Sequence, residues 1–335
     1  MTGAAGVFGL APGAGARFVR ATAIALGLCL AMAAAARAQS TAGDEMFDPQ
    51  RVVDGIEIDR RDCDALATTH TAIWVDGACL RYYAAGLALD APNPVVAAWL
   101  NGDVLGPHGN DARRRQSGFG PAAMIAQESR LATRFGIPFI FLGRPGTYGS
   151  AGKHHTMRGR PREAALVDGM LDALKQRYRI GAWALGGHSG GGTLVAAMLA
   201  RRSDLRCAVI SSGAASYRAY LEARGLLAPG APLARFDPYE ALDQVPRDPA
   251  RRIFVIGDPR ETNVPFSSQR RYFEGLRERG LAAWLVPLER ATDARHHGLV
   301  DFGETATGMC GAGAPTEAIL ETLAAMPPQG PRLTN

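Results

Sequence analysis

Short apolar runs alternate with longer amphipathic segments along most of this chain. From residue 95 onward the runs are continuously apolar, which is typical of strands buried on both faces of a parallel sheet. We expect strands at 95–100, 138–142, 182–185, 207–210, 253–256 and 282–288. Residues 45–93, which include TAIWVD and CLRYYAAG, predict leading antiparallel strands.

The segments between these runs carry the signals of helices. Residues 161–178 begin with a proline suited to a first helical turn and repeat large apolar side chains every four residues. A second helix should start with Ser267 or Ser268 as its cap and end at Gly280, and a last one lies within 315–326. This alternation predicts an α/β fold with a mostly parallel, doubly wound sheet, which binds ligands at the carboxyl ends of its strands.

The first residues predict a secretory signal peptide. Arg17 and Arg20 precede a short apolar run, and Ala36-Arg37-Ala38 forms an A-x-A cleavage site. Cleavage after Ala38 would divide the chain into a signal peptide at 1–38 and one folded domain at 39–335, in a secreted or periplasmic protein. A retained membrane anchor is the alternative. No later segment reaches transmembrane length, so we expect no stable membrane insertion after cleavage.

Charge and cysteine content narrow the function classes. The formal charge is +5, and removing the three arginines of the signal leaves +2. The arginines are dispersed and matched by acids, so we expect no nucleic-acid partner. The four remaining cysteines favour disulfides in an oxidising compartment. Cys63 and Cys79 are the expected pair. Cys207 and Cys310 are not, because we expect them at opposite edges of the sheet, more than about 15 Å apart.

One motif predicts a catalytic residue. Residues 187–191 read G-x-S-x-G, with Ser189 between a buried run and a helix. A nucleophile on such a tight bend has close backbone neighbours, and flanking glycines avoid the clash. Neither this segment nor GTYGSAGKHH satisfies a nucleotide-binding motif. The alternative is a glycine-rich turn in which Ser189 only caps the next helix.

A serine nucleophile needs a base and an orienting acid. Downstream of Ser189 the only histidines are His296 and His297, of which we favour His297. The loop after the run 253–256 offers Asp258 and Glu261 as the acid.

The oxyanion of the reaction also needs two donors. We expect the amide of Gly190 and that of Asp103, in the loop LNGD after an early strand. His188 and Tyr148 are expected to contact substrate. No metal or organic cofactor is implied, because no Cys/His spacing suggests a metal site.

The segments LNGD, RPGTYGSAG, GGHSGGG, GDPRETNVP and RHHGL occur in the order found in α/β-hydrolases, and the chain resembles that family over nearly all of 39–335. The catalytic domains of prolyl-oligopeptidase-type and dienelactone-hydrolase-type members are the most similar. The resemblance favours Glu261 as the acid, because of its position before Val264-Pro265, and leaves 213–248 as a short insertion that forms one pocket wall. Asn101 departs from the usual oxyanion-loop histidine.

The family implies acyl transfer to water through an acyl-enzyme. A serine hydrolase acting on a carboxylic ester is therefore the leading hypothesis, with a small-molecule or peptide acyl substrate. A serine peptidase or amidase of the same fold and a non-catalytic binding protein with a hydrolase fold remain alternatives.

Overall fold

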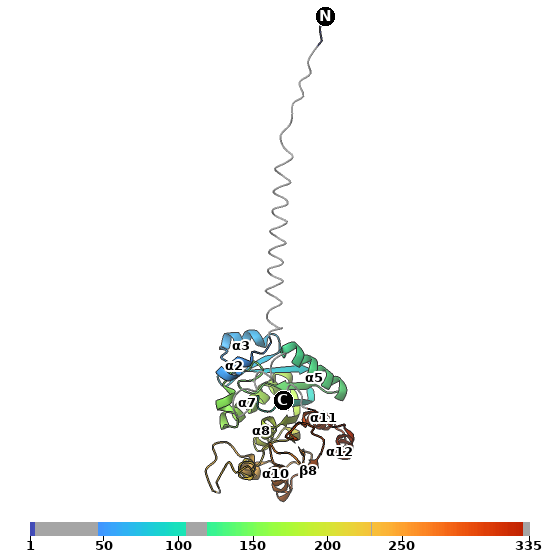
Figure 1. Ribbon diagram of the computed structural model, residues 1–335. Coiled ribbons are helices and arrows are strands. Elements are labelled where there is room, and N and C mark those ends of the chain that lie inside the picture. The colour runs from blue at the N-terminus through green and yellow to red at the C-terminus, as the bar shows by residue number, and fades with distance from the viewer. Residues whose placement is uncertain (4–45, 105–118, 229, 331–335) are drawn as a thin grey trace. The chain divides into compact units, whose positions relative to one another are not determined.

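The computed structural model describes residues 1–3, 46–104, 119–228 and 230–330 (Figure 1). Met46–Asn335 forms one compact unit, and all that follows concerns that unit. The expected signal peptide lies outside the described residues except for its first three positions, and so does its cleavage site at Ala38.

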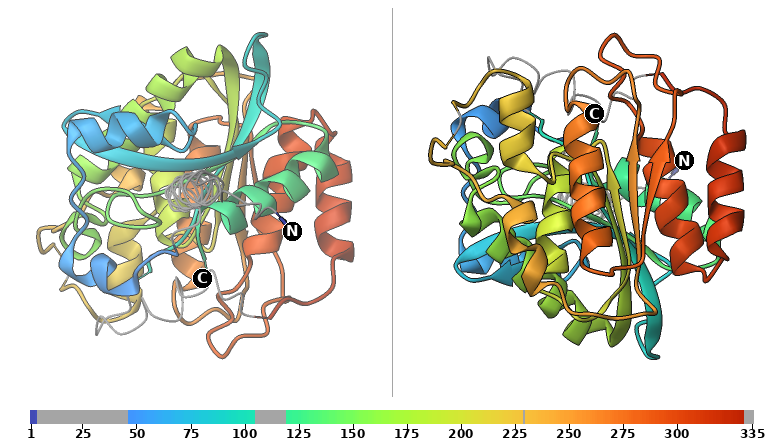
Figure 2. Two further views of the ribbon diagram at one scale, coloured as in Figure 1. Left: turned by 90° about the horizontal axis from the view of Figure 1, so that it is seen from above. Right: turned by 90° about the horizontal axis from the view of Figure 1, so that it is seen from below.

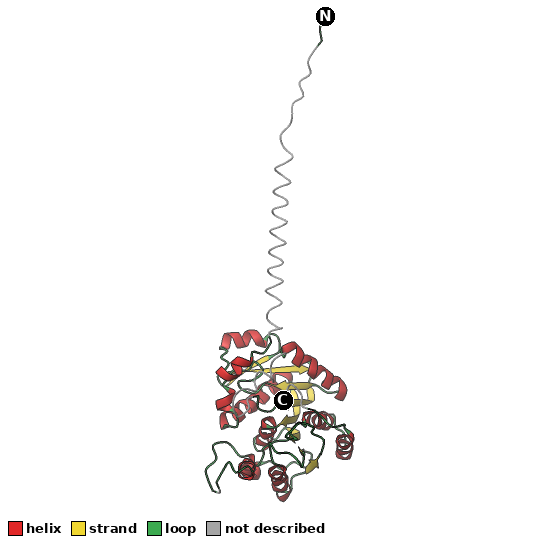
Figure 3. Cartoon of the chain, viewed as in Figure 1, coloured by secondary structure: helices red, strands yellow, loops and turns green. Residues whose placement is uncertain are grey.

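A mostly parallel sheet forms the centre of this unit (Figure 3). Its strands run in the order β1-β2-β4-β3-β5-β6-β7-β8. The pairs β1–β2 and β2–β4 are antiparallel, and the other neighbours are parallel. The bounds are β1 Ala72–Val75, β2 Ala78–Ala85, β3 Asn93–Leu100, β4 Phe139–Leu142, β5 Ile180–His188, β6 Leu205–Ser211, β7 Arg252–Gly257 and β8 Ala283–Pro287.

Helices cover both faces of the sheet (Figure 2). One apolar core lies beneath α7, α8 and α10, and a second lies beneath α5, α11 and α12. The remaining helices are short and connect the main elements. The bounds are α2 Pro49–Asp54, α3 Arg60–Ala67, α5 Pro121–Phe135, α6 His154–Met157, α7 Pro161–Tyr178, α8 Gly190–Leu199, α9 Tyr217–Ala223, η1 Pro238–Gln244, α10 Phe266–Glu278, α11 Val300–Gly311 and α12 Thr316–Ala325.

The α/β architecture predicted from the apolar runs is confirmed, and each predicted parallel strand falls on its run. The start of α10 differs from the expectation. Pro265 occupies the cap position, and Ser267 and Ser268 both lie inside the helix. The Ser268 hydroxyl donates to the Pro265 carbonyl at 2.7 Å, so it reinforces the first turn from within.

Two disulfides are present, and one of them contradicts the sequence analysis. Cys63 pairs with Cys79 as expected. Cys207 also pairs with Cys310, with a Cα–Cα distance of 6.2 Å. The expectation was wrong because it left Cys310 at the carboxyl edge of the sheet. The 12 residues of α11 instead carry the chain back by about 18 Å, at 1.5 Å per residue, to the edge where β6 begins.

Small residues bring α11 close enough for this bond. Gly303 and Gly311 face the sheet, where an added Cβ would lie 2.4 Å from Trp99 and 2.9 Å from Ala184. Larger side chains at these positions would push the helix outward. The close contact between α11 and the strands therefore depends on both glycines.

Candidate active site

Ser189 lies on a sharp bend between β5 and α8. Its backbone angles, φ 54° and ψ −121°, are ones that a residue with a side chain rarely adopts. A Cβ on Gly187 would lie 2.5 Å from the backbone of Gly191, and a Cβ on Gly191 would lie 2.0 Å from the Leu100 carbonyl. The glycines of the motif therefore permit the close backbone contacts around a strained serine.

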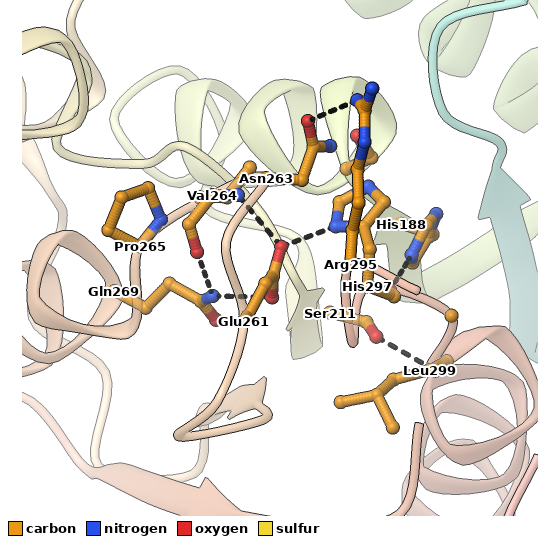
Figure 4. A network of polar contacts seen from close by, with 12 residues as sticks. His188, Ser211, Glu261, Asn263, Val264, Pro265, Gln269, Arg295, His297 and Leu299 are labelled. Carbon is orange, nitrogen blue, oxygen red and sulfur yellow. Dashed lines mark hydrogen bonds and ion pairs between the residues drawn. The ribbon is translucent and has the colours of Figure 1, made fainter. Parts of the chain in front are cut away.

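His297 and Glu261 meet beside this bend, although 36 residues separate them in sequence. Glu261 follows β7, His297 follows β8, and the imidazole Nδ1 hydrogen-bonds to the Glu261 carboxylate (Figure 4). The same carboxylate accepts hydrogen bonds from the Val264 amide and the Gln269 side chain, both at 2.9 Å. Burial raises the pKa of the Glu261 carboxyl, and these two donors oppose that rise by stabilising its charge.

The structure brings Glu261, and not Asp258, to the histidine. Asp258 is buried and accepts hydrogen bonds from the side chain and amide of Arg260 and from the amide of Ala291. Burial alone would raise the pKa of the Asp258 carboxyl, but these donors hold that pKa below its ordinary value. Asp258 thus ties the β7 loop to the β8 loop.

The other downstream histidine is turned away from the acid. His296 Nδ1 lies 3.0 Å from the carbonyl of Ala291. Asp293 accepts from the amides of His297 at 2.9 Å and Gly298 at 2.7 Å, so it fixes the turn that presents His297. We did not predict this role of Asp293 from the sequence. Its signal was an aspartate in a loop just before the histidines, because such a side chain accepts from the amide two residues on, here that of Arg295 at 3.0 Å.

His188 links the serine bend to the histidine loop. Its Nε2 lies 2.8 Å from the His297 carbonyl, and the centroids of the two rings are 4.6 Å apart. His188 is buried at 2 % exposure and immediately precedes Ser189. We expected His188 to contact substrate. The structure places it beneath the site, where it holds His297 next to the bend.

The loop after β3 packs against the first turn of α8. A Cβ on Gly102 would lie 3.0 Å from the Ser189 Cβ, and one on Gly190 would lie 2.3 Å from Asp103 Oδ1. Gly190 and Asp103 are therefore both adjacent to Ser189. Tyr148 lies under the same loop, where its hydroxyl accepts from the Asn101 side chain at 3.0 Å, and it is buried rather than part of the cavity lining.

A buried arginine holds that loop. Arg144 donates to the Asp103 carboxylate at 2.9 Å and to the Asn101 carbonyl at 3.2 Å, and it pairs with the buried Glu163 at 2.8 Å. Burial would raise the pKa of the Asp103 carboxyl, but Arg144 and Arg158 hold that pKa below its ordinary value. Arg144 lies in the segment RPGTYGSAG, whose similarity to the family did not predict a role for this residue.

Solved structures with similar folds were found at low sequence identity. Est1E of Butyrivibrio proteoclasticus, with bound ferulic acid, aligns at a TM-score of 0.50 and 16% identity over 75% of this chain and 97% of its own. The esterase Pf2001 of Pyrococcus furiosus aligns at 0.50 and 16% over 83% of this chain and 96% of its own. The chain has the α/β-hydrolase fold. No protein-family model matches the sequence, and no curated protein matches it by sequence.

In this α/β-hydrolase fold a cavity of about 390 Å³ opens beside Ser189 and Gly190. One of its walls comes from Tyr217–Phe236, as the sequence analysis expected for the insertion. Tyr217, Tyr220 and Phe236 supply aromatic surface there, and Val264 of the β7 loop also lines the cavity. The bend, the imidazole–carboxylate pair and the cavity therefore share one edge of the sheet.

Proposed function

We propose that this protein is an exported serine hydrolase that cleaves carboxylic esters through an acyl-enzyme. The strained conformation of Ser189 carries the proposal. A serine that only capped α8 would gain nothing from such angles, whereas a nucleophile must project from the bend toward a substrate. The pair formed by the half-buried His297 imidazole and the buried Glu261 carboxylate lies beside it and supplies the base that a hydroxyl requires.

Ser189, His297 and Glu261 each have a distinct role in the proposed reaction. Glu261 accepts the hydrogen bond from Nδ1 of His297, which leaves Nε2 as the proton acceptor. The Ser189 hydroxyl gives its proton to Nε2 while its oxygen attacks the ester carbonyl carbon. His297 then returns that proton to the departing alkoxide. A water molecule attacks the acyl-enzyme by the same route, releases the acid and regenerates the serine.

The negative charge of the tetrahedral intermediate needs donors that are already in place. The amide of Gly190 belongs to the first turn of α8, where amides lack partners within the helix and the helix dipole favours an anion. The amide of Asp103 is the second proposed donor. The ion pairs of its side chain with Arg144 and Arg158 fix the position of this loop. Each donor of this kind contributes about 3 kcal/mol in other hydrolases.

Two further observations support parts of the proposal. Among acyl substrates, an ester needs the least catalytic assistance from such a site. One of the similar folds also belongs to a protein described as an esterase. Two disulfides favour folding in an oxidising compartment, in agreement with the secretory signal expected at 1–38. None of the helices in the described part of the chain is long and apolar enough to cross a membrane.

The first test is covalent labelling of the mature protein with a fluorophosphonate, read by intact mass beside hydrolysis of p-nitrophenyl butyrate. We expect one adduct on the native protein and none on Ser189→Ala, with loss of turnover on the order of 10⁶-fold. The melting temperature of Ser189→Ala serves as the folding control.

Retained turnover in a clean preparation of folded Ser189→Ala would overturn the assignment. Absence of an adduct on folded native protein would favour a binding protein with a hydrolase fold. Parallel assays with peptide anilides compare the peptidase alternative directly.

A further inference from the structure

The cavity beside Ser189 has an unusually cationic lining. Its two carboxylates, Asp103 and Glu163, are both in ion pairs with the buried Arg144, and Asp103 also pairs with Arg158. Four more guanidinium groups line the same cavity, and none of them forms an ion pair with a carboxylate among the residues that the structure describes, although the charge of Arg235 helps to lower the pKa of Asp103. These are Arg160, Arg224, Arg235 and Arg295.

Two of these arginines come from different segments and meet on one neutral residue. Arg224, after α9, donates to the backbone carbonyl of Asn263 at 3.2 Å. Arg295, in the histidine loop, lies 3.4 Å from the side-chain oxygen of the same asparagine (Figure 4). Asn263 is two residues beyond Glu261, and Arg295 is two residues before His297. Both guanidinium groups therefore lie on the side of the cavity formed by the Glu261 and His297 loops.

Both guanidinium groups are exposed to solvent and keep donors that their neutral partners do not use, although Arg224 also donates to the Tyr220 hydroxyl at 3.1 Å. Two positive charges held near one neutral residue create a positive potential that favours an anion. Guanidinium groups suit carboxylates because they offer two parallel donors. The surrounding wall is aromatic, with Tyr217, Tyr220 and Phe236 in the lining.

We propose that the preferred substrates carry a carboxylate in addition to the scissile ester, and that Arg224 and Arg295 bind this second group. This inference rests on the proposed function, because it assigns the substrate class of the same site. The carboxylate belongs either to the acyl part or to the alcohol part of the ester, and the aromatic wall accommodates the body that joins the two groups.

The test compares matched pairs of esters with and without the anionic group. Mono-p-nitrophenyl adipate against p-nitrophenyl hexanoate tests the acyl part, and 4-carboxyphenyl butyrate against phenyl butyrate tests the alcohol part. Within each pair the ratio of kcat/KM, anionic over neutral, is measured for the native protein and for Arg224→Gln/Arg295→Gln. Comparing ratios between proteins cancels the intrinsic reactivity of the esters.

We expect the ratio to fall by about tenfold or more in the double variant for at least one pair. The native ratio should also fall as ionic strength rises, because the attraction is between charges. Arg51→Gln/Arg247→Gln removes two exposed arginines outside the cavity lining and should leave the ratio unchanged. Thermal melts confirm that both variants are folded.

A ratio that stays the same in the folded double variant for both pairs would overturn the substrate class. An equal fall in the control variant would also do so, since the preference would then follow net charge alone. Failure of the proposed function is separate, because it would appear as absent fluorophosphonate labelling and absent hydrolysis of the neutral esters by native protein.

Discussion

Two buried carboxylates lie on the loop after β7, and their partners give them different tasks. Glu261 receives its hydrogen bonds from the imidazole, an amide and Gln269. Asp258 receives its own from Arg260 and the amide of Ala291. Both are carboxylates of similar burial near the same histidine loop, yet one contacts the base and the other joins two loops.

This difference predicts opposite phenotypes for the two isosteric amides. Glu261→Gln should lower kcat on p-nitrophenyl butyrate by about 10³- to 10⁴-fold, because the imidazole loses the partner that fixes its tautomer. Asp258→Asn should change kcat by only a few-fold but lower the free energy of unfolding by about 1–3 kcal/mol, because it weakens charge-assisted hydrogen bonds. Steady-state kinetics and urea denaturation of both variants check this. The reverse pattern would reassign the acid.

The sequence predicted the residues whose motifs are local and could not predict the contacts that join distant segments. Ser189 and its glycines form one continuous motif, and the order serine, acid, histidine limited the other candidates. The choice of Glu261 over Asp258 needed the position of His297. The contact of His188 with the His297 carbonyl, and the contact of Arg144 with Asp103, depend on which loops meet at the sheet edge.

At the scale of elements, α5 and α11 bury two glutamates between them. Glu128 is fully buried and neither of its carboxyl oxygens has a hydrogen-bond partner among the described residues. Glu304 accepts from Gln127 at 3.2 Å. Burial raises the pKa of Glu304 to about 8, and burial together with the charge of Glu304 raises the pKa of Glu128 well above its ordinary value.

These carboxyls should make the fold less stable as pH rises. Between the ordinary pKa of 4.5 and about 8, Glu304 keeps its proton in the folded chain and loses it in the unfolded chain. Stability therefore decreases with pH over this range, by up to about 1.4 kcal/mol per unit for one group. Glu304→Gln should flatten that slope and raise the free energy of unfolding at pH 8, with little change at pH 4.

Urea denaturation across this pH range checks the prediction. Glu321→Gln, an exposed position on α12, is the matched control and should leave the slope unchanged. An identical slope in Glu304→Gln and native protein would show that the buried carboxyl does not govern the pH dependence.

The elements themselves were predictable because each apolar run had the length and continuity of a buried strand. The path of α11 back across the sheet was harder to predict from the sequence. In the sequence, this closely packed helix is only a glycine-rich segment. The direction in which the helix runs, which the sequence does not show, is what brings Cys310 next to Cys207.

At the scale of the whole molecule, the two disulfides constrain the chain very differently. The cysteines of the first bond are 16 residues apart, and those of the second are 103 apart. Closing a longer loop removes more conformational freedom from the unfolded chain, about 3 kcal/mol for 15 residues and about 4.7 kcal/mol for 100.

We therefore expect Cys207→Ala/Cys310→Ala to lose more stability than Cys63→Ala/Cys79→Ala, by about 1.5 to 2 kcal/mol. Both pairs are buried, so each variant leaves a similar small void. Urea unfolding of the native protein and both variants under oxidising conditions measures the difference. Equal losses, or a larger loss for the first pair, would show that loop length does not decide the contribution.

The segment that carries Arg224 is closed at its base by one side chain. Buried Asp237 accepts hydrogen bonds from the amides of Tyr217, Arg218 and Tyr239, so both ends of the segment are tied to the same carboxylate. Its interior reaches the strand-edge loops through Arg224, which donates to the Asn263 carbonyl in the loop that holds Glu261. For protein engineering, this makes the segment a cassette: with Asp237 and Arg224 kept, exchanging the other cavity-lining positions would alter which esters are recognised while the reacting groups stay where they are.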